Sequence, residues 1–295
     1  MYVVRNNIWR LIGVAGTIVC AGLFIIHPSW PTPDKLIIFL TFVFMTVGQA
    51  KEMLKHLLPF VALLLVYESF RGLVPQLNSH VNYMWMVSAD KFLFGRLPTH
   101  TLQNWWWHGA VQWFDFIFYL AYMLHFIIPI SLALLIWKYR EKSYWQYVST
   151  YLVVSFFGFL TFLIFPAAPP WLASDKGLIQ PITRVSSYIF GALGVQNFPS
   201  VYNKISPNPV AAVPSLHAAY ATLLVIFVYK LFGWRWALLA CIYPLLIFVG
   251  TVYMGEHYAI DEILGIVYAV GAYLIVSWIF SDKVTRTIKQ RLSRA

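Results

Sequence analysis

The sequence predicts an all-α protein embedded in a membrane, and two observations support this fold class. Of its 295 residues, 60% are hydrophobic and only 11% are charged, whereas soluble domains carry about 25% charged residues. The apolar residues gather into stretches of about 20 residues, the length that a helix needs to cross a bilayer. We therefore expect a single membrane domain over residues 1–295, built as a polytopic bundle of about eight transmembrane helices.

Eight stretches of membrane length follow one another along the chain. They cover about 8–27, 36–54, 55–74, 112–137, 145–165, 214–233, 235–254 and 259–280. The sequence KEMLKH at 51–56 separates the second from the third, so a tight hairpin is expected there. The first stretch is followed by HPSWPTP rather than a small-residue cleavage site, which favours an uncleaved span over a signal peptide. Seven or nine spans are the alternative, and they would reverse the later half of the chain.

The distribution of Lys and Arg predicts the orientation of the bundle. With the N-terminus inside, the inner segments hold about twice as many basic residues as the outer ones. We therefore expect a multi-pass plasma-membrane protein with both termini in the cytoplasm, and the net charge of +10 needs no nucleic-acid partner. The domain is expected to comprise peripheral N-terminal helices over about 1–54, a core over about 55–281 and a basic cytoplasmic tail over 282–295.

Two long segments are expected on the outer side. Segment 75–111 contains Trp85 and a run of three tryptophans at 105–107. Because tryptophan prefers the headgroup level, this segment is expected to form short amphipathic pieces on the membrane. Segment 166–213 is rich in proline, and a long, stiffened loop beside polar motifs is usually functional.

Two polar motifs stand where apolar stretches begin, PSLHAAYA at 214–221 and GEHYAID at 255–261. A histidine in or beside hydrocarbon is costly, so its presence implies a site, a pathway or a partner. His257 and Asp261 are four residues apart, which places both side chains on one face of a helix. An Asp that accepts from one imidazole nitrogen leaves the other nitrogen free to attack. With His217 as the proton donor, these residues suffice for phosphoryl transfer through a phosphohistidine.

A phosphate site is expected beside these residues. Pro214 and Ser215 indicate a helix start, whose free N–H groups favour an anion that Ser215 and His217 would also contact. A transferring phosphoryl group needs cations as well, and the outer candidates are Arg71, Lys176, Arg184 and Lys204. Glu68 lies three residues before Arg71, so a mutual ion pair is the alternative to substrate contact there.

We expect neither a metal nor a cofactor. Zinc binding by His217, Glu256, His257 and Asp261 is the alternative, because zinc accepts such ligands, but the spacing and supporting residues typical of zinc sites are lacking. His125 stands in the middle of the fourth expected span, and a hydrogen-bonded packing role is expected for it.

The motifs resemble those of the type 2 phosphatidic acid phosphatase superfamily of membrane phosphatases and phosphotransferases. That family carries PSGH in its second motif and SR-x5-H-x3-D in its third. The chain matches with PSLH at 214–217 and with His257 and Asp261, whereas Gly250 and Thr251 stand where the Ser and Arg would be. The family's first motif is not recognisable. The resemblance implies His257 as the nucleophile, Asp261 as its partner and His217 as the acid for the leaving group.

Further motifs resemble the branch that includes fungal inositol phosphorylceramide synthase and its bacterial relatives. They are GEHYAID, FPAAPPW at 165–171 and DKFLFGRLPTHTLQ, which begins at Asp90. In that branch an alcohol can resolve the phosphohistidine instead of water. The resemblance covers about 65–265, implies a catalytic core, adds Asp90 to the expected substrate-binding residues, and makes Arg184 the first choice for the missing cation, ahead of Lys176.

The leading function is therefore an enzyme that acts on a lipid phosphate ester, with its site facing the outer side. A transferase would pass a phospho-headgroup to a lipid or polar alcohol, and a phosphatase would pass it to water; exclusion of water by the membrane favours transfer. A non-enzymatic lipid transporter would need ionisable residues near mid-membrane on several helices, whereas here they gather at one face. An assembly subunit explains the tryptophan-rich segment but not the His/Asp pattern. The expected partners are lipids, and no oligomeric state is predicted.

Overall fold

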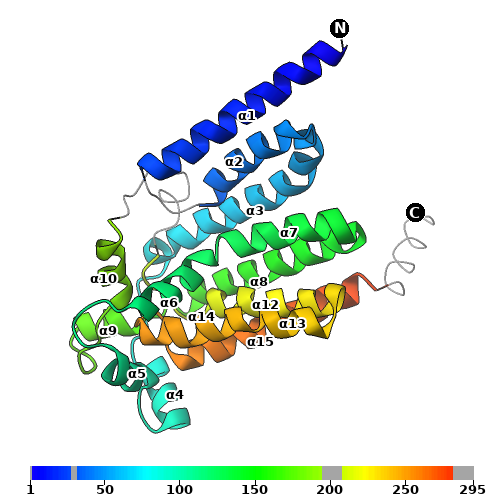
Figure 1. Cartoon of the computed structure of the whole chain (residues 1–295). Coiled ribbons are helices and arrows are strands. Elements are labelled where there is room, and N and C mark those ends of the chain that lie inside the picture. Colours follow the sequence, from blue (N-terminus) through cyan, green and yellow to red (C-terminus); the bar gives the residue numbers. More distant parts are fainter. Residues whose placement is uncertain (1, 28–31, 195–207, 282–295) are drawn as a thin grey trace.

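A computed structural model of the chain describes residues 2–27, 32–194 and 208–281, which form helices joined by short loops (Figure 1). Beside the helices, this part of the chain holds two isolated bridges, from Ala167 to Asn82 and to Ala211. The predicted all-α membrane bundle is confirmed, and the number of crossings stays a prediction. By length and composition, the stretches able to cross a membrane are Asn7–Ile26, Ala50–Leu77, Ile127–Ile164, Trp234–Tyr253 and Ala259–Ile279.

Each predicted span corresponds to one helix or to two helices with a short break between them. In chain order these are α1 (Tyr2–Ile26), α2 (Pro33–Thr46), α3 (Ala50–Leu77), α6 (Trp113–Leu124) with α7 (Ile127–Arg140), α8 (Tyr144–Ile164), α12 (Leu216–Phe232), α13 (Trp234–Ala240) with α14 (Ile242–Tyr253), and α15 (Ala259–Ile279). Figure 1 shows them running back and forth between two ends of the bundle. The loop end carries the short helices α4 (Trp85–Phe94), α5 (Pro98–Trp106), α9 (Pro170–Asp175) and α10 (Val185–Ala192). The opposite end, where α2 turns into α3, is here called the hairpin end.

The hairpin between the second and third spans lies earlier than the sequence predicted. α2 ends at Thr46, and the chain turns through Gly48, whose φ of +73° is in the left-handed region that favours glycine. KEMLKH at 51–56 therefore forms the first turns of α3 rather than a loop. The charges of this segment predicted a loop between two helices. Lys and Glu are, however, good helix formers, and their long side chains can reach water from the end of a helix.

Buried aromatic rings hold the helices of the core together. The core lies among α3, α7, α8, α12 and α15. Tyr147 of α8 contacts Phe60 of α3 and Phe227 of α12, with ring centroids 6.4 and 5.1 Å apart. Such ring pairs contribute about 0.5–1.5 kcal/mol each beyond their buried area. They fix α12, which carries His217 in its first turn, against the centre of the bundle.

Gly265 allows α15 to approach the PSLH motif closely. A Cβ on this glycine would collide with the carbonyl oxygen of Ser215 and lie 2.9 Å from the Cβ of Ala218. Small residues at helix contacts permit such an approach of two backbones in membrane proteins. The separation of α12 from α15, and with it the spacing of the two polar motifs, therefore depends on Gly265.

Substitution of Gly265 tests this dependence. We expect Gly265→Ala to push α12 away from α15, to destabilise the fold by about 1–3 kcal/mol and to lower any activity that needs the two motifs in contact. Gly271→Ala is the matched control on the same helix, since a Cβ there meets nothing within 4 Å. Thermal unfolding and activity of both variants check the prediction, and equal behaviour of the two would contradict it.

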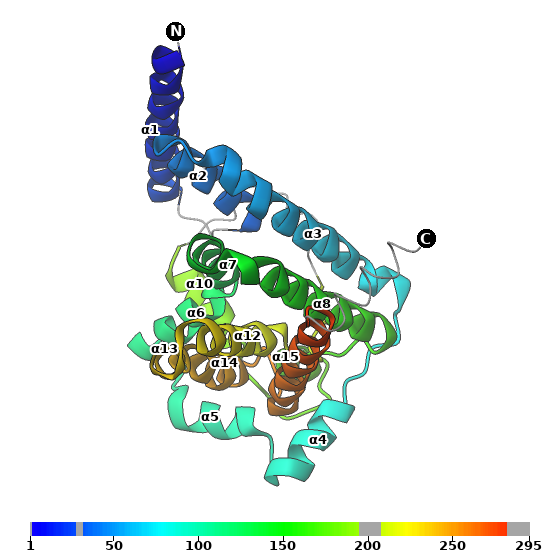
Figure 2. The same cartoon turned by 90° about the vertical axis from the view of Figure 1, so that its right-hand side faces the viewer.

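The peripheral and outer segments follow the expected outline in part. α1 lies beside α2 at the edge of the bundle (Figures 1 and 2). Segment 75–111 forms the short helices α4 and α5, as expected, and their position on a membrane surface stays a prediction. The basic tail 282–295 and Lys204 lie outside the described residues, and the division of the domain at residue 54 stays a prediction.

Candidate active site

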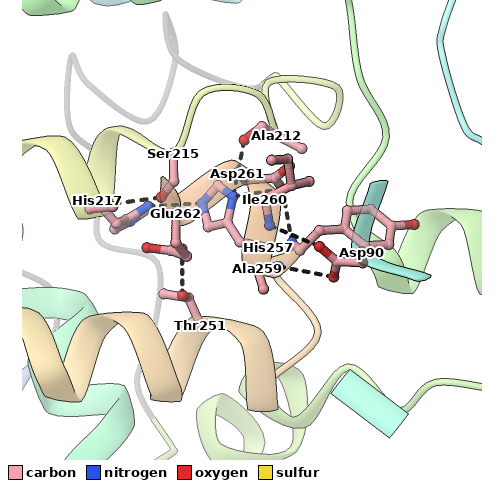
Figure 3. Close-up of polar contacts among 12 residues, drawn as sticks. Asp90, Ala212, Ser215, His217, Thr251, His257, Ala259, Ile260, Asp261 and Glu262 are labelled. Carbon is pink, nitrogen blue, oxygen red and sulfur yellow. Dashed lines mark hydrogen bonds and ion pairs between the residues drawn. The ribbon is translucent and has the colours of Figure 1, made fainter. Parts of the chain in front are cut away.

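The structure brings together the two histidines and the aspartate of the polar motifs at the loop end of the bundle. His217 Nδ1 lies 3.3 Å from His257 Nε2, and His257 Nδ1 lies 3.4 Å from Asp261 Oδ2 (Figure 3). His257 and Asp261 are 5% and 0% exposed. His217 comes from α12, Asp261 from α15, and His257 from the loop that precedes α15. Residues 40 positions apart in sequence thus form one row of contacting groups.

The neighbours of His257 determine which of its nitrogens is free to react. Nδ1 lies 3.1 Å from the carbonyl oxygen of Ala212, in addition to Asp261. A carbonyl oxygen only accepts hydrogen bonds, so Nδ1 must carry the proton. In the neutral ring the lone pair is then on Nε2, which faces His217. The geometry therefore leaves the lone pair of His257 Nε2 facing the second imidazole, and a nucleophilic role for this atom stays a prediction.

The surrounding carboxylates favour the protonated form of His257. Its pKa lies above the ordinary value of 6.5. Burial alone would lower this pKa, but the hydrogen bond with Asp261 and the charges of Asp261, Glu256 and Glu262 outweigh burial. A positive charge that develops on the ring during reaction is therefore stabilised.

Backbone contacts of Ser215 and Asp261 hold the two motifs in register. The N–H of Ser215 donates to the carbonyl oxygen of Asp261, 3.0 Å away. Ser215 Oγ accepts from the N–H of Ala218 at 3.2 Å, which makes it the N-cap of α12, as its sequence position indicated. Asp261 Oδ2 also accepts from the N–H of Tyr258 at 2.9 Å, in a capping box at the start of α15. Each motif therefore begins its helix and is bound to the other.

Asp90 and Gln103, the two ends of the DKFLFGRLPTHTLQ motif, hold the loop around His257. Asp90 is 0% exposed and accepts from the N–H groups of Ala259 and Ile260 at 3.1 and 2.8 Å (Figure 3). Burial raises its pKa to about 6. Gln103 Nε2 donates to the carbonyl oxygen of Tyr253 at 2.9 Å. Asp90 thus contacts backbone at the start of α15, and the substrate contact expected for it stays a prediction. Gln103 carries no signal of this role in the sequence, because its partners Thr183 and Tyr253 are far away along the chain.

A cavity of about 160 Å³ opens beside the histidines. Its wall includes both His217 and His257. The His217 ring stacks between Tyr122 and His125, with centroid separations of 4.4 and 4.3 Å. His125 lies in the break between α6 and α7 and also lines the cavity. Its ring packs against His217 and Tyr220, which agrees with the packing part of the role expected for it. Nδ1 has no hydrogen-bond partner among the described residues, and the hydrogen-bonded part of that role stays a prediction.

The sequence favoured Arg184 and then Lys176 as the phosphate-binding cation, but of these candidates the structure places Arg71 beside the histidines. Arg71 lines the cavity and donates from Nε to Glu68 Oε2 at 2.7 Å, so the expected ion pair exists on the cavity wall. Arg184 does not line this cavity; its guanidinium donates to both carboxylate oxygens of Glu256, at 2.8 and 3.3 Å. Lys176 is the C-cap residue of the short helix α9 and does not line the cavity either. The structure therefore favours Arg71, and roles for Arg184 and Lys176 in phosphate binding stay predictions.

The Arg184–Glu256 pair ties the proline-rich loop to the loop of His257. The Arg184 guanidinium also lies over the Trp171 ring, 4.1 Å from its centroid. Glu256 accepts in addition from Ser186. Both carboxylate oxygens of Glu256 are thus engaged by Arg184 and Ser186 rather than by a site shared with the histidines. The described residues contain no group of three or more His, Cys, Asp or Glu that could hold a metal ion.

Two departures from the superfamily motifs have local explanations. Leu216 replaces the glycine of PSGH, and it fits because Gly158 of α8 faces it; a Cβ on Gly158 would lie 2.9 Å from Leu216 Cδ2. Thr251 occupies the position of the motif arginine and donates to Glu262 Oε1 at 2.7 Å. Thr251 and Glu262 are both buried, and Figure 3 shows them beside the two histidines. Glu262 could not be recognised from the sequence, because its contact with Thr251 forms only when α14 and α15 are paired.

Comparisons with known proteins agree with this geometry. The PAP2 superfamily matches residues 84–275, which include both polar motifs. The chain is 32% identical over 242 residues to phosphoinositol dihydroceramide synthase of Bacteroides thetaiotaomicron, covering 77% of this chain and 75% of that protein. It is 27% identical over 169 residues to the inositol phosphorylceramide synthase catalytic subunit aur1 of Schizosaccharomyces pombe, covering 55% of this chain and 38% of that protein. No solved structure matched the chain. The chain therefore belongs to the PAP2 superfamily and is a membrane-embedded phosphotransferase or phosphatase of that type.

Proposed function

We propose that the chain is a lipid phosphotransferase that moves a phosphoinositol headgroup from a donor lipid to the hydroxyl group of a ceramide-type lipid. The observation that carries the chemistry is the arrangement of His257, with Nδ1 held by Ala212 and Asp261 and Nε2 directed at His217. The two relatives named above carry phosphoinositol and ceramide in their names, which supports this headgroup and this acceptor.

The reaction proceeds in two displacements at phosphorus. His257 Nε2 attacks the donor phosphodiester, an N–P bond forms, and the bond to the donor lipid's oxygen breaks as His217 supplies a proton to that oxygen. The headgroup phosphate is then held on His257. The acceptor hydroxyl attacks the same phosphorus, its proton passes to His217, and the N–P bond breaks. Asp261 holds the His257 ring and stabilises its positive charge throughout.

Arg71 is proposed as the cation that binds the phosphate oxygens. It belongs to α3 and lies on the wall of the cavity that both histidines line. A guanidinium presents several N–H donors, so it can contact a phosphate oxygen while one donor stays with Glu68. Glu68 then fixes the position of the guanidinium rather than removing it from the site.

Water is the competing acceptor, so hydrolysis is the second candidate function. His257 and Asp261 are buried, and the rings of Tyr122 and His125 pack on half-buried His217. Such packing limits the access of water, which favours transfer to a lipid alcohol. The orientation with both termini in the cytoplasm, the extracytoplasmic position of the site and the plasma membrane as location are parts of the same proposal, supported by the bias of basic residues.

The acceptor is tested with purified protein in mixed micelles that contain an inositol-labelled phospholipid and a short-chain fluorescent ceramide. We expect the label in a ceramide product, with little free inositol phosphate. Release of inositol phosphate at the same rate with and without ceramide would instead favour the hydrolytic function.

The pH dependence of transfer should report the protonation of His257. Nε2 attacks only as the neutral ring, and the pKa of this group is raised above 6.5, so kcat/KM should fall with decreasing pH along a limb centred above pH 6.5. Asp261→Asn removes the hydrogen-bonded charge that raises the pKa, so the limb should move to lower pH while the rate falls. Profiles of the two proteins measure this shift, and an unmoved limb would assign the titration to another group.

A further inference from the structure

A second cavity, larger than the one beside the histidines, is lined by residues at the hairpin end of the bundle and by neither histidine. Figure 1 shows this end, where α2 turns into α3, opposite the end that carries the short helices α4, α5, α9 and α10. The cavity has a volume of about 930 Å³ and opens between α1, α2 and the first turns of α3. Its lining combines basic side chains with an aromatic ring and apolar groups, among them Trp9, Arg10, Met45, Lys51, Lys55 and Leu58. Neither the superfamily chemistry nor the proposed transfer uses this cavity.

Close packing of α1 on α2 builds the cavity walls. A Cβ on Gly13 would lie 2.8 Å from Met45 Cβ, and one on Gly16 would collide with the Phe42 ring, so only glycine allows this approach. The turn at Gly48 then leads directly into α3, and Arg10 Nη2 lies 3.9 Å from where a Cβ of Gly48 would be. The Arg10 guanidinium is thus held over the hairpin turn, beside the start of α3.

The basic groups of this cavity outnumber the carboxylates around them. Lys55 forms an ion pair with Glu52 at 2.7 Å. Arg10 and Lys51 take part in no salt bridge within 4.0 Å among residues 2–27, 32–194 and 208–281. Both side chains are exposed. The cavity therefore presents two cations that can contact an anion from outside the protein.

We propose that this cavity binds the headgroup of an anionic phospholipid, with its phosphate between Arg10 and Lys51. The bound lipid's acyl chains would lie along Met45, Leu58 and the exposed apolar surface of α1, whose membrane-length stretch is only 6% buried. Trp9 suits the headgroup level. Basic pockets between membrane helices on the cytoplasmic side bind anionic headgroups in this way, and the hairpin end faces the cytoplasm in the proposed orientation. The lipid then links α1 to the start of α3.

The test uses the full-length protein in detergent, titrated with phosphatidylglycerol or phosphatidylcholine and followed by native mass spectrometry. The double variant Arg10→Gln/Lys51→Gln should retain phosphatidylglycerol about 30-fold less tightly than the unmodified protein, given about 1 kcal/mol for each basic group near an anionic lipid. Phosphatidylcholine binding should not change. Lys142→Gln/Arg235→Gln is the charge-matched control, since neither residue lines the cavity, and it should bind phosphatidylglycerol normally.

Several outcomes would overturn the proposal. Equal losses in the two double variants would show a general charge effect, and equal retention of the two lipids would show no headgroup preference. Binding of glycerol phosphate as tight as that of the lipid would show a site for a free anion. If the Arg10→Gln/Lys51→Gln protein does not fold, the single Lys51→Gln variant replaces it, and normal phosphatidylglycerol binding by that variant would equally contradict the proposal.

Discussion

Replacement of His257 by glutamine should lower headgroup transfer by at least about 10⁴-fold, because the nucleophile is lost while the side chain remains polar. His217→Gln should lower it by about 10²–10⁴-fold, the range typical of a general acid. Both proteins should keep the stability of the fold, since each replacement retains a hydrogen-bonding side chain. Product formation from labelled donor lipid, followed over time, measures the two losses.

A donor with an activated leaving group separates the two roles. A nitrophenyl phosphodiester of inositol needs no proton on its departing oxygen. The first-turnover burst of nitrophenol should therefore be nearly normal in the His217→Gln protein and absent in His257→Gln. Restoration of nitrophenol release in the His257→Gln protein, or equal failure of both variants, would contradict the assignment of nucleophile and acid.

Replacement of Arg71 by alanine should lower transfer by about 10²–10³-fold, because a preorganised charge that stabilises the transferring phosphate is removed. It also leaves Glu68 buried without its cation, and that carboxylate is only 5% exposed, so a loss of stability is expected as well. The double variant Arg71→Ala/Glu68→Gln removes the stranded charge. We expect it to recover thermal stability but not activity, and this difference distinguishes phosphate binding from a purely structural ion pair.

Arg184→Lys is the comparison for this prediction. Lysine loses the two-pronged contact with Glu256 and the contact with the Trp171 ring, so a modest loss is expected from loosening the loop beside His257. The assignment to Arg71 would be contradicted if a stably folded Arg184→Lys protein lost activity while the Arg71→Ala/Glu68→Gln protein kept near-normal transfer. That result would indicate that Arg184, in the proline-rich loop, binds the phosphate.

The sequence predicted the fold class and the proximity of His217, His257 and Asp261 because both depend on local patterns. Stretches of membrane length are read from composition. The spacing of His257 and Asp261 predicted one helical face, which is wrong for His257, because α15 begins only at Ala259. The side chains nevertheless lie 3.4 Å apart, since Asp261 is in the first turn of α15 and His257 directly precedes that turn. The placement of His217 beside them needed only the expectation that two helix starts lie at the same end of the bundle. These inferences need no knowledge of which helices are neighbours.

The remaining site residues depend on contacts between distant segments. Arg184 could be recognised as a cation near the motifs, but its pairing with Glu256, 72 positions away, is a tertiary contact. Asp90 likewise contacts residues 169 and 170 positions away, at the start of α15. The position of His125 against His217 depends on the break between α6 and α7, where Pro129 of α7 lacks the N–H that a continuous helix would use. Pattern alone cannot supply these neighbours.

The measurement that tests the central claim most directly is the identification of the covalent intermediate. The protein is mixed with donor lipid carrying a labelled phosphoinositol headgroup, without ceramide, quenched, and digested for mass spectrometry. We expect an acid-labile phosphoinositol adduct on His257 that disappears when ceramide is added, with the label recovered in the ceramide product. An adduct on another residue, or turnover of labelled donor and ceramide with no adduct on His257 at any time, would contradict it.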